Sequence, residues 1–125
     1  MMENRKKILI VDDDPDHLLI CNILFRRRGY DVFPLLGCDP IEDLTHAIDT
    51  FKPSLIFMDH FMPGVCGYDA VKLLKADPVY RSIPVIYFSV HGDLALIAQE
   101  AGADAYFQKP FLSDDLLKIA EKFVA

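Results

Sequence analysis

The feature that most limits how this chain can fold is a regular alternation of two kinds of segment. Short apolar runs rich in β-branched and aromatic residues alternate with segments whose apolar residues recur at helical spacing. The predicted strands are residues 7–12, 31–35, 55–59, 84–89 and 105–108. The predicted helices are residues 15–28, 40–51, 68–76, 94–101 and 114–124. This alternation predicts an α/β fold, in which helices cover both faces of a parallel sheet.

The order of the five strands follows from their apolar character and from one proline. The runs ILIV (8–11) and LIFM (55–58) are apolar throughout, as expected of central strands that are buried on both faces. Pro34 interrupts the second strand, and proline is tolerated essentially only at a sheet edge because it lacks a backbone N–H. In a doubly wound sheet of order 2-1-3-4-5, the second strand is an edge. We therefore predict this order for a five-stranded parallel sheet with five helices.

Proline and glycine mark several of the expected helix ends. Pro15 and Pro40 suit the first turns of the first two helices, and each follows an aspartate that can cap the helix. Gly29 and Gly102 follow the first and fourth helices, where a left-handed C-terminal cap is expected.

Size, composition and charge indicate one globular domain. The chain has 125 residues, so residues 1–125 are expected to form a single domain. Hydrophobic residues make up 52% of the chain and charged residues 26%, which favours a packed core over disorder. The net charge of -6 argues against nucleic acid or an anionic membrane as a direct partner. No apolar run approaches the ~18 residues of a membrane span.

The cysteines and the start of the chain predict a cytoplasmic protein. Cys21, Cys38 and Cys66 are odd in number and match no metal-binding or redox spacing, so we expect free thiols in a reducing cytoplasm. Residues 1–7 are polar and basic, with no apolar signal core behind them.

Acidic residues gather where the predicted strands end. In an open α/β sheet, ligands bind beyond the carboxyl ends of the strands, where the strand order reverses. The first strand ends in Asp12 and Asp13 and the third in Asp59, so three carboxylates are expected to converge there. The fourth strand ends in Ser89, and the fifth leads to Lys109. Such an oxygen-rich pocket suits Mg²⁺, which takes carboxylates, waters and phosphate oxygens as ligands.

The segment VDDDPD also shares features with two other kinds of acidic site. An EF-hand calcium loop requires a glycine where His17 stands and a bidentate glutamate where Ile23 stands, so this interpretation fails. A phosphatase of the haloacid-dehalogenase type would use Asp12 and Asp14 as nucleophile and acid, but it leaves Asp59 unexplained. This phosphatase is kept as a distant alternative.

Four motifs, in order, carry a resemblance to a known family. They are ILIVDDDPD from residue 8, LIFMDHFMPGVCG from residue 55, IPVIYFSVHGD from residue 83 and GADAYFQKPF from residue 102. Across essentially its whole length, the chain resembles the receiver domain of two-component response regulators, in the CheY-like superfamily. The resemblance implies the flavodoxin-like form of the fold. It also implies a signalling domain rather than an enzyme, one that promotes its own phosphorylation and dephosphorylation in a phosphorelay.

The resemblance implies a phosphoacceptor and a magnesium site. Asp59 matches the aspartate that accepts the phosphoryl group. Asp13 and Asp59 would hold Mg²⁺ by their carboxylates, Phe61 by its backbone carbonyl, and Asp12 largely through metal-bound water. A carboxylate can attack phosphorus, and phosphoryl transfer needs positioning and charge neutralisation more than acid–base catalysis.

The resemblance also implies a switch and partners. Lys109 would pair with the Asp59 carboxylate and then with phosphoryl oxygens, while Ser89 and Tyr106 match the switch hydroxyl and the switch aromatic residue. The donor would be a sensor histidine kinase or a histidine phosphotransfer protein, and the output a downstream protein target. Both a monomer and a homodimer are compatible with the sequence. No output module follows Ala125, so output must come from binding if the chain is complete.

Three residues depart from the family pattern near the expected phosphoryl group. Val90 stands where a small residue is usual, and Phe61 and His91 occupy positions that modulate hydrolysis of the phosphoryl group in the family. They bear on access and phosphoryl lifetime. A non-phosphorylated scaffold with the receiver fold is therefore an alternative.

The first predicted helix has more apolar residues than one face about 100° wide can bury. They are Leu18, Leu19, Ile20, Cys21, Ile23, Leu24 and Phe25. Two interpretations stay open at this point. One is a broad packed face with a few exposed apolar residues, and the other is a docking patch beside the acidic pocket.

Overall fold

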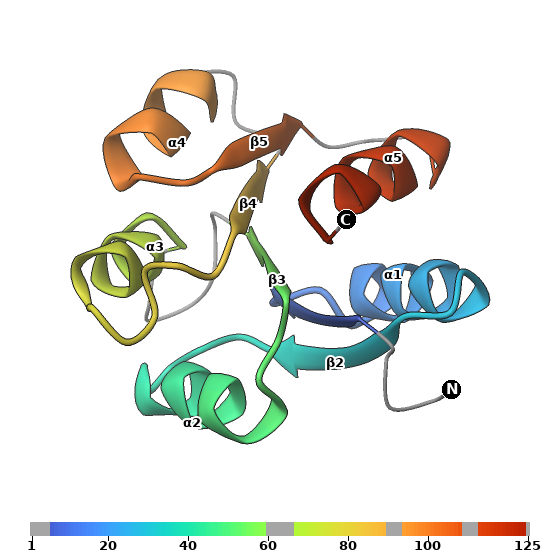
Figure 1. Ribbon diagram of the computed structural model, residues 1–125, viewed down its shortest axis with the longest axis horizontal. Helices are drawn as coiled ribbons and strands as arrows, with labels where there is room; N and C mark the ends of the chain where they lie inside the picture. Colours follow the sequence, from blue (N-terminus) through green and yellow to red (C-terminus); the bar gives the residue numbers. More distant parts are fainter. Residues whose placement is uncertain (1–5, 60–66, 90–93, 109–112, 125) are drawn as a thin grey trace.

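The computed structural model describes residues 6–59, 67–89, 94–108 and 113–124 (Figure 1). Within these residues, strands and helices alternate in the predicted order. The strands are β1 (Lys7–Asp12), β2 (Asp31–Leu36), β3 (Leu55–Asp59), β4 (Val85–Ser89) and β5 (Ala105–Gln108). The helices are α1 (Pro15–Arg27), α2 (Glu42–Phe51), α3 (Gly67–Ala76), α4 (Leu94–Ala101) and α5 (Ser113–Val124). The predicted bounds agree closely with these, except at the start of α2.

The sheet has the predicted order and the predicted edge. All strand pairs are parallel, and the order is β2-β1-β3-β4-β5. Pro34 lies in the edge strand β2, opposite Ile10 of β1. Central strand β1 is covered on both faces, and its residues Ile8 to Val11 are fully buried. The predicted doubly wound fold is therefore confirmed.

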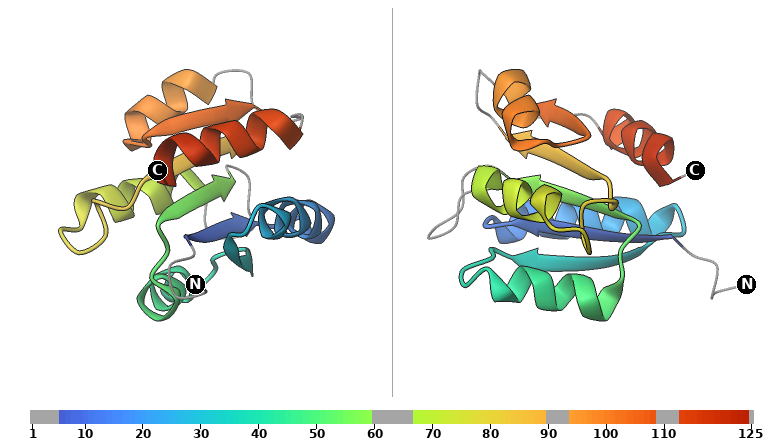
Figure 2. Two further views of the ribbon diagram at one scale, coloured as in Figure 1. Left: turned by 45° about the vertical axis from the view of Figure 1, so that its right-hand side comes forward. Right: turned by 60° about the vertical axis from the view of Figure 1, so that its left-hand side comes forward.

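Successive strand residues point to opposite faces of the sheet, and each face has its own core. Leu9, Ile56 and Tyr87 pack on the face that α2, α3 and α4 cover. Ile8, Phe57 and Phe88 pack on the other face, which α1 and α5 cover. Figure 1 and the two views of Figure 2 show these three layers, with the sheet in the middle. Because all strands are parallel, their carboxyl ends lie together at one edge of the sheet, between the two helical layers.

The start of α1 forms as the sequence predicts. Pro15 is the first residue of the helix, and Asp14 is its N-cap. The Asp14 carboxylate oxygen Oδ1 accepts hydrogen bonds from the backbone N–H groups of Asp16 at 3.0 Å and His17 at 3.4 Å. At the other end, Gly29 has a φ of 90°, the left-handed conformation expected just beyond a helix.

The predicted start of α2 is wrong. The helix begins at Glu42, and Asp39 does not cap it, because the N-cap position is Ile41 and makes no side-chain hydrogen bond. The backbone N–H of Asp43 donates to the Pro40 carbonyl at 3.0 Å, and that of Leu44 to the Ile41 carbonyl at 3.0 Å. These two bonds span three residues each, so the chain enters α2 through tight turns that supply the first helical hydrogen bonds.

We expect Asp14→Ala to lower the free energy of unfolding by about 1 kcal/mol, because two N–H groups of the first helical turn lose their acceptor. Urea denaturation followed by circular dichroism measures the change. Asp14→Asn is the matched control, since it removes the same charge but keeps a side-chain oxygen and should cost only a few tenths of a kcal/mol. Equal losses in the two variants would contradict the capping role.

Candidate functional site

Three carboxylates meet at the carboxyl end of the sheet, where the strand order reverses. Asp12 ends β1 and Asp59 ends β3, and the residues just before them, Val11 and Met58, are paired across the two strands. Asp13 follows Asp12 directly. Carboxylate oxygens of Asp12, Asp13 and Asp59 all lie within 4.8 Å of one another. The convergence predicted from the sequence is therefore present.

The three carboxylates differ in their exposure. The Asp12 side chain is 0% exposed and Asp59 is 5% exposed, whereas Asp13 faces solvent. Two unit charges about 4 Å apart repel by roughly 1 kcal/mol in water and roughly 4 kcal/mol at the effective dielectric of a protein surface. Such a cluster is therefore suited to a cation that enters from the solvent side of Asp13.

The donor set suits a hard divalent cation. All three residues offer carboxylate oxygens, the ligands that Mg²⁺ prefers, and within residues 6–59, 67–89, 94–108 and 113–124 the cluster consists of these carboxylates alone. Mg²⁺ is usually held by one or two carboxylates together with waters and phosphate oxygens. An exposed Asp13 beside two buried partners leaves room for such additional ligands. The residues present thus fit magnesium.

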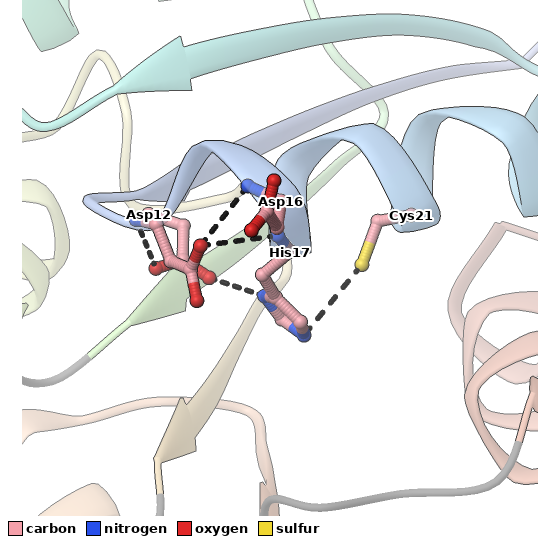
Figure 3. Close-up of polar contacts among 5 residues, drawn as sticks. Asp12, Asp16, His17 and Cys21 are labelled. Atoms are coloured by element: carbon pink, nitrogen blue, oxygen red, sulfur yellow. Dashed lines mark hydrogen bonds and ion pairs between the residues drawn. The ribbon is translucent and has the colours of Figure 1, made fainter.

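The Asp12 carboxylate is held by the first turn of α1 (Figure 3). Its Oδ1 accepts a hydrogen bond from the Asp14 backbone N–H at 3.1 Å. Its Oδ2 makes a close contact with Nδ1 of His17. The other ring nitrogen of His17, Nε2, lies 3.9 Å from the Cys21 sulfur. The buried carboxylate therefore has polar partners at both oxygens.

His17 is the residue of this site that sequence reasoning missed. The chain contains four histidines, and their spacing matches no metal-binding motif. The available signal was a histidine in the first helical turn, five residues after the last residue of a strand. At that spacing the side chain can reach the end of the strand only if the helix begins directly after the strand. The Asp14 cap and Pro15 at the first helical position start α1 there.

Of the other predicted site residues, the structure describes only Ser89 and Tyr106. Ser89 ends β4, one residue beyond Phe88, which is paired with Asp59 of β3. Tyr106 lies in β5 opposite Tyr87, and its side chain is 51% exposed. Phe61 and Lys109 lie outside the described residues, as do Val90 and His91. Their predicted roles stay predictions.

Two of the predicted thiols lie in the described part of the chain. Cys21 and Cys38 are buried thiols, one in the core under α1 and α5 and the other in the core under α2 to α4. Cys66 lies outside the described residues. Burial explains both described cysteines as small core residues.

Helix α1 also exposes an apolar surface next to the acidic cluster. Leu18, Cys21 and Phe25 are its buried residues. Leu19, Ile20 and Ile23 are 57%, 54% and 42% exposed. Ile23 is four residues after Leu19 and three after Ile20, so the three side chains lie on one side of the helix. A groove of about 280 Å³ lies beside Leu19, lined by Pro15, Leu18, Leu19, Asn22, Pro34 and Leu36. The surface that the docking interpretation requires is therefore present, and its role stays a prediction.

Comparison with known proteins identifies the family. The response regulator receiver domain profile matches residues 8–121. Sporulation initiation phosphotransferase F of Bacillus subtilis is 30% identical over 122 residues, which cover 95% of this chain and 94% of that protein. The chain therefore belongs to the response regulator receiver domain family, whose members are signalling domains.

Further relatives agree with the fold and the family. The DNA-binding response regulator MtrA of Mycolicibacterium smegmatis is 33% identical over 115 residues, or 90% of this chain and 48% of that protein. The chain thus spans about half the length of MtrA. A CheY-like receiver domain protein from Methanospirillum hungatei has a TM-score of 0.82 and 29% identity, covering 96% of this chain and 94% of that one. Among the described helices, none is both long and apolar enough to cross a bilayer.

We expect Asp13→Asn to raise the free energy of unfolding of the metal-free protein by about 1 kcal/mol, because it removes repulsion at the carboxylate cluster. Magnesium should then stabilise the variant less than the parent, since one ligand is lost. Urea denaturation with and without magnesium chloride measures both effects.

The control for this prediction is Asp16→Asn. Asp16 is an exposed acidic residue in the first turn of α1, outside the carboxylate cluster. Its replacement should lower stability by a few tenths of a kcal/mol, because a negative charge near a helix N-terminus is favourable. A parent protein whose stability does not change with magnesium would contradict the metal site.

Proposed function

We propose that this chain is the phosphoacceptor receiver of a two-component phosphorelay, with Asp59 as the acceptor. The observation that carries the proposal is the position of Asp59, at the end of β3 and within 4.8 Å of Asp12 and Asp13. Its phosphoryl donor would be a sensor histidine kinase or a histidine phosphotransfer protein. Membership in the receiver family supports this assignment.

In the proposed reaction, a carboxylate oxygen of Asp59 attacks the phosphorus of a phosphohistidine. The new O–P bond gives an acyl phosphate, and the P–N bond breaks to return the imidazole of the donor. Asp12, Asp13 and Asp59, with the Phe61 carbonyl, would hold Mg²⁺, which supplies positive charge to the phosphoryl oxygens. Asp12 is buried and would present its carboxylate to the cation in a fixed orientation. Asp13 faces solvent, so the phosphoryl donor would approach the site from the side of Asp13.

The proposed switch links the site to the face of α4, β5 and α5. Ser89 would donate its hydroxyl to a phosphoryl oxygen, and Lys109 would hold another. Tyr106 would then turn inward and change a surface that a downstream protein binds. The exposure of Tyr106 and a hollow of about 500 Å³ beside it support this proposal, because the ring has space to move. Ala98, Gln99, Ala103, Asp104, Ala105 and Tyr106 line the hollow.

Incubation with a small phosphodonor and Mg²⁺ tests the assignment, with intact mass as the measurement. The parent should gain the mass of one phosphoryl group, and Asp59→Asn should gain none. Omitting Mg²⁺ should abolish the gain, because the carboxylates then repel the donor.

The alternative functions predict different results in the same experiment. A non-phosphorylated scaffold takes up no phosphoryl group in the parent. A haloacid-dehalogenase-type phosphatase turns over substrate, and its turnover survives Asp59→Asn but not Asp12→Asn. The buried position of Asp12, with both oxygens engaged, supports a positioning role over that of a nucleophile.

Lys109→Ala is expected to separate phosphorylation from its remote effect. The fold and most Mg²⁺ binding should stay intact, because Asp12, Asp13 and Asp59 remain. The response of Tyr106 should be lost, because no ammonium group then holds the phosphoryl oxygen. Tyr106 is followed by NMR in both proteins while Mg²⁺ and the phosphate mimic beryllofluoride are titrated. An unchanged Tyr106 response at equal Asp59 occupancy would overturn the role of Lys109.

A further inference from the structure

We infer that His17 is a positioning residue of the acidic site, which holds the Asp12 carboxylate in a fixed orientation through its Nδ1–H group. The inference rests on the proposed function, in that the oriented carboxylate serves magnesium binding. It starts from the contact between His17 Nδ1 and Asp12 Oδ2. An ionised carboxylate only accepts hydrogen bonds, so the inference requires the ring proton to be on Nδ1.

The contact fixes the second oxygen of a carboxylate whose first oxygen is already held. The Asp14 backbone N–H donates to Asp12 Oδ1 at 3.1 Å, and His17 donates to Oδ2. With a donor at each oxygen, the carboxylate plane cannot rotate without breaking a hydrogen bond. A carboxylate oxygen can accept more than one hydrogen bond, so holding the group in one orientation is compatible with a hydrogen bond from a water on the cation.

The imidazole ring is itself held in place by the core. Its side chain is 16% exposed, and its ring centroid lies 5.3 Å from that of Phe88 on β4. The sulfur of Cys21, one helical turn further along α1, lies 3.9 Å from Nε2 (Figure 3). Phe88 is paired with Asp59 of β3, so the ring that supports His17 stands beside the proposed phosphoacceptor strand. The donor is therefore preorganised by α1 and β4 together.

A preorganised partner behind a metal-binding carboxylate has a measurable effect. Replacing such partners typically weakens metal affinity by about 10-fold to 100-fold. Asp12 is proposed to act through metal-bound water, so we expect the lower end of this range. His17→Leu, which fills similar space but has no donor, should weaken Mg²⁺ binding about tenfold.

His17→Asn separates the hydrogen bond from the ring. The asparagine amide nitrogen occupies the place of imidazole Nδ1 relative to the backbone, so the variant keeps a donor for Asp12 Oδ2 but loses the ring that packs on Phe88. Its Mg²⁺ affinity should stay within about threefold of the parent, well short of the tenfold loss. His46→Leu, an exposed histidine on α2, is the control for loss of an imidazole elsewhere.

Isothermal titration calorimetry gives the Mg²⁺ affinity of the four proteins, and NMR gives an independent measurement on the metal-free parent. Long-range ¹H–¹⁵N correlations of the His17 ring should show a proton on Nδ1. A bare Nδ1 would overturn the inference whatever the affinities, and this holds even if His17→Leu does not fold. Unchanged or tighter Mg²⁺ binding by His17→Leu would also overturn it, as would an equal loss in His17→Asn.

The same proteins separate this inference from the proposed function. If the parent accepts no phosphoryl group but His17→Leu binds Mg²⁺ about tenfold more weakly, the phosphoacceptor proposal fails and the positioning role stands. If the parent is phosphorylated at Asp59 and the variants bind Mg²⁺ equally, the positioning role fails alone.

Discussion

The Asp12 carboxylate is fully buried at the end of an apolar strand, so the surrounding structure has to supply its hydrogen-bond partners. Ile8 to Val11 are fully buried between two helical layers, and the chain ends that strand with a side chain that is also fully buried. A buried charge costs several kcal/mol unless hydrogen bonds and partners compensate it. Here the first turn of α1 supplies both, through the Asp14 backbone N–H and the His17 ring. The start of α1 is therefore part of the site and more than a support for it.

The packing of α1 links this site to both the sheet and the neighbouring strands. Phe25 is fully buried, with its ring 5.3 Å from that of Phe57 on β3, so the helix packs on the strand next to the one that ends in Asp12.

Lys75 of α3 contacts the residues just before β4 and β5, at the ends of these strands that lie away from the acidic cluster. Its ammonium group donates to the Asp104 carboxylate at 2.7 Å and to the Ile83 carbonyl at 2.8 Å. A hydrogen bond and an ion pair thus hold the amino ends of these strands, while the acidic cluster lies at the carboxyl ends of β1 and β3.

The sheet architecture also explains why one helix serves two surfaces. The buried stripe of α1 contains Leu18, Cys21 and Phe25, while Leu19 and Ile20 point away from the core and are more than half exposed. The first turn of the same helix reaches the carboxylate cluster. A partner that binds the exposed side of α1 would therefore lie next to Asp13 and Asp59. This arrangement favours the docking interpretation of the exposed α1 residues, whose role stays a prediction.

The alternation of elements, the edge position of β2 and the convergence of Asp12, Asp13 and Asp59 could all be predicted from the amino-acid sequence. The alternation and the edge position follow from local rules, such as the spacing of apolar residues and the missing N–H of Pro34. The convergence follows from the rule that the carboxyl ends of parallel strands meet where the strand order reverses. The packing of the whole chain set the start of α2 at Glu42 and the contact between His17 and Asp12. It also decided which apolar residues of α1 stay exposed. These features depend on how each helix sits against the sheet, which is set by the packing of two whole cores and by no short stretch of sequence.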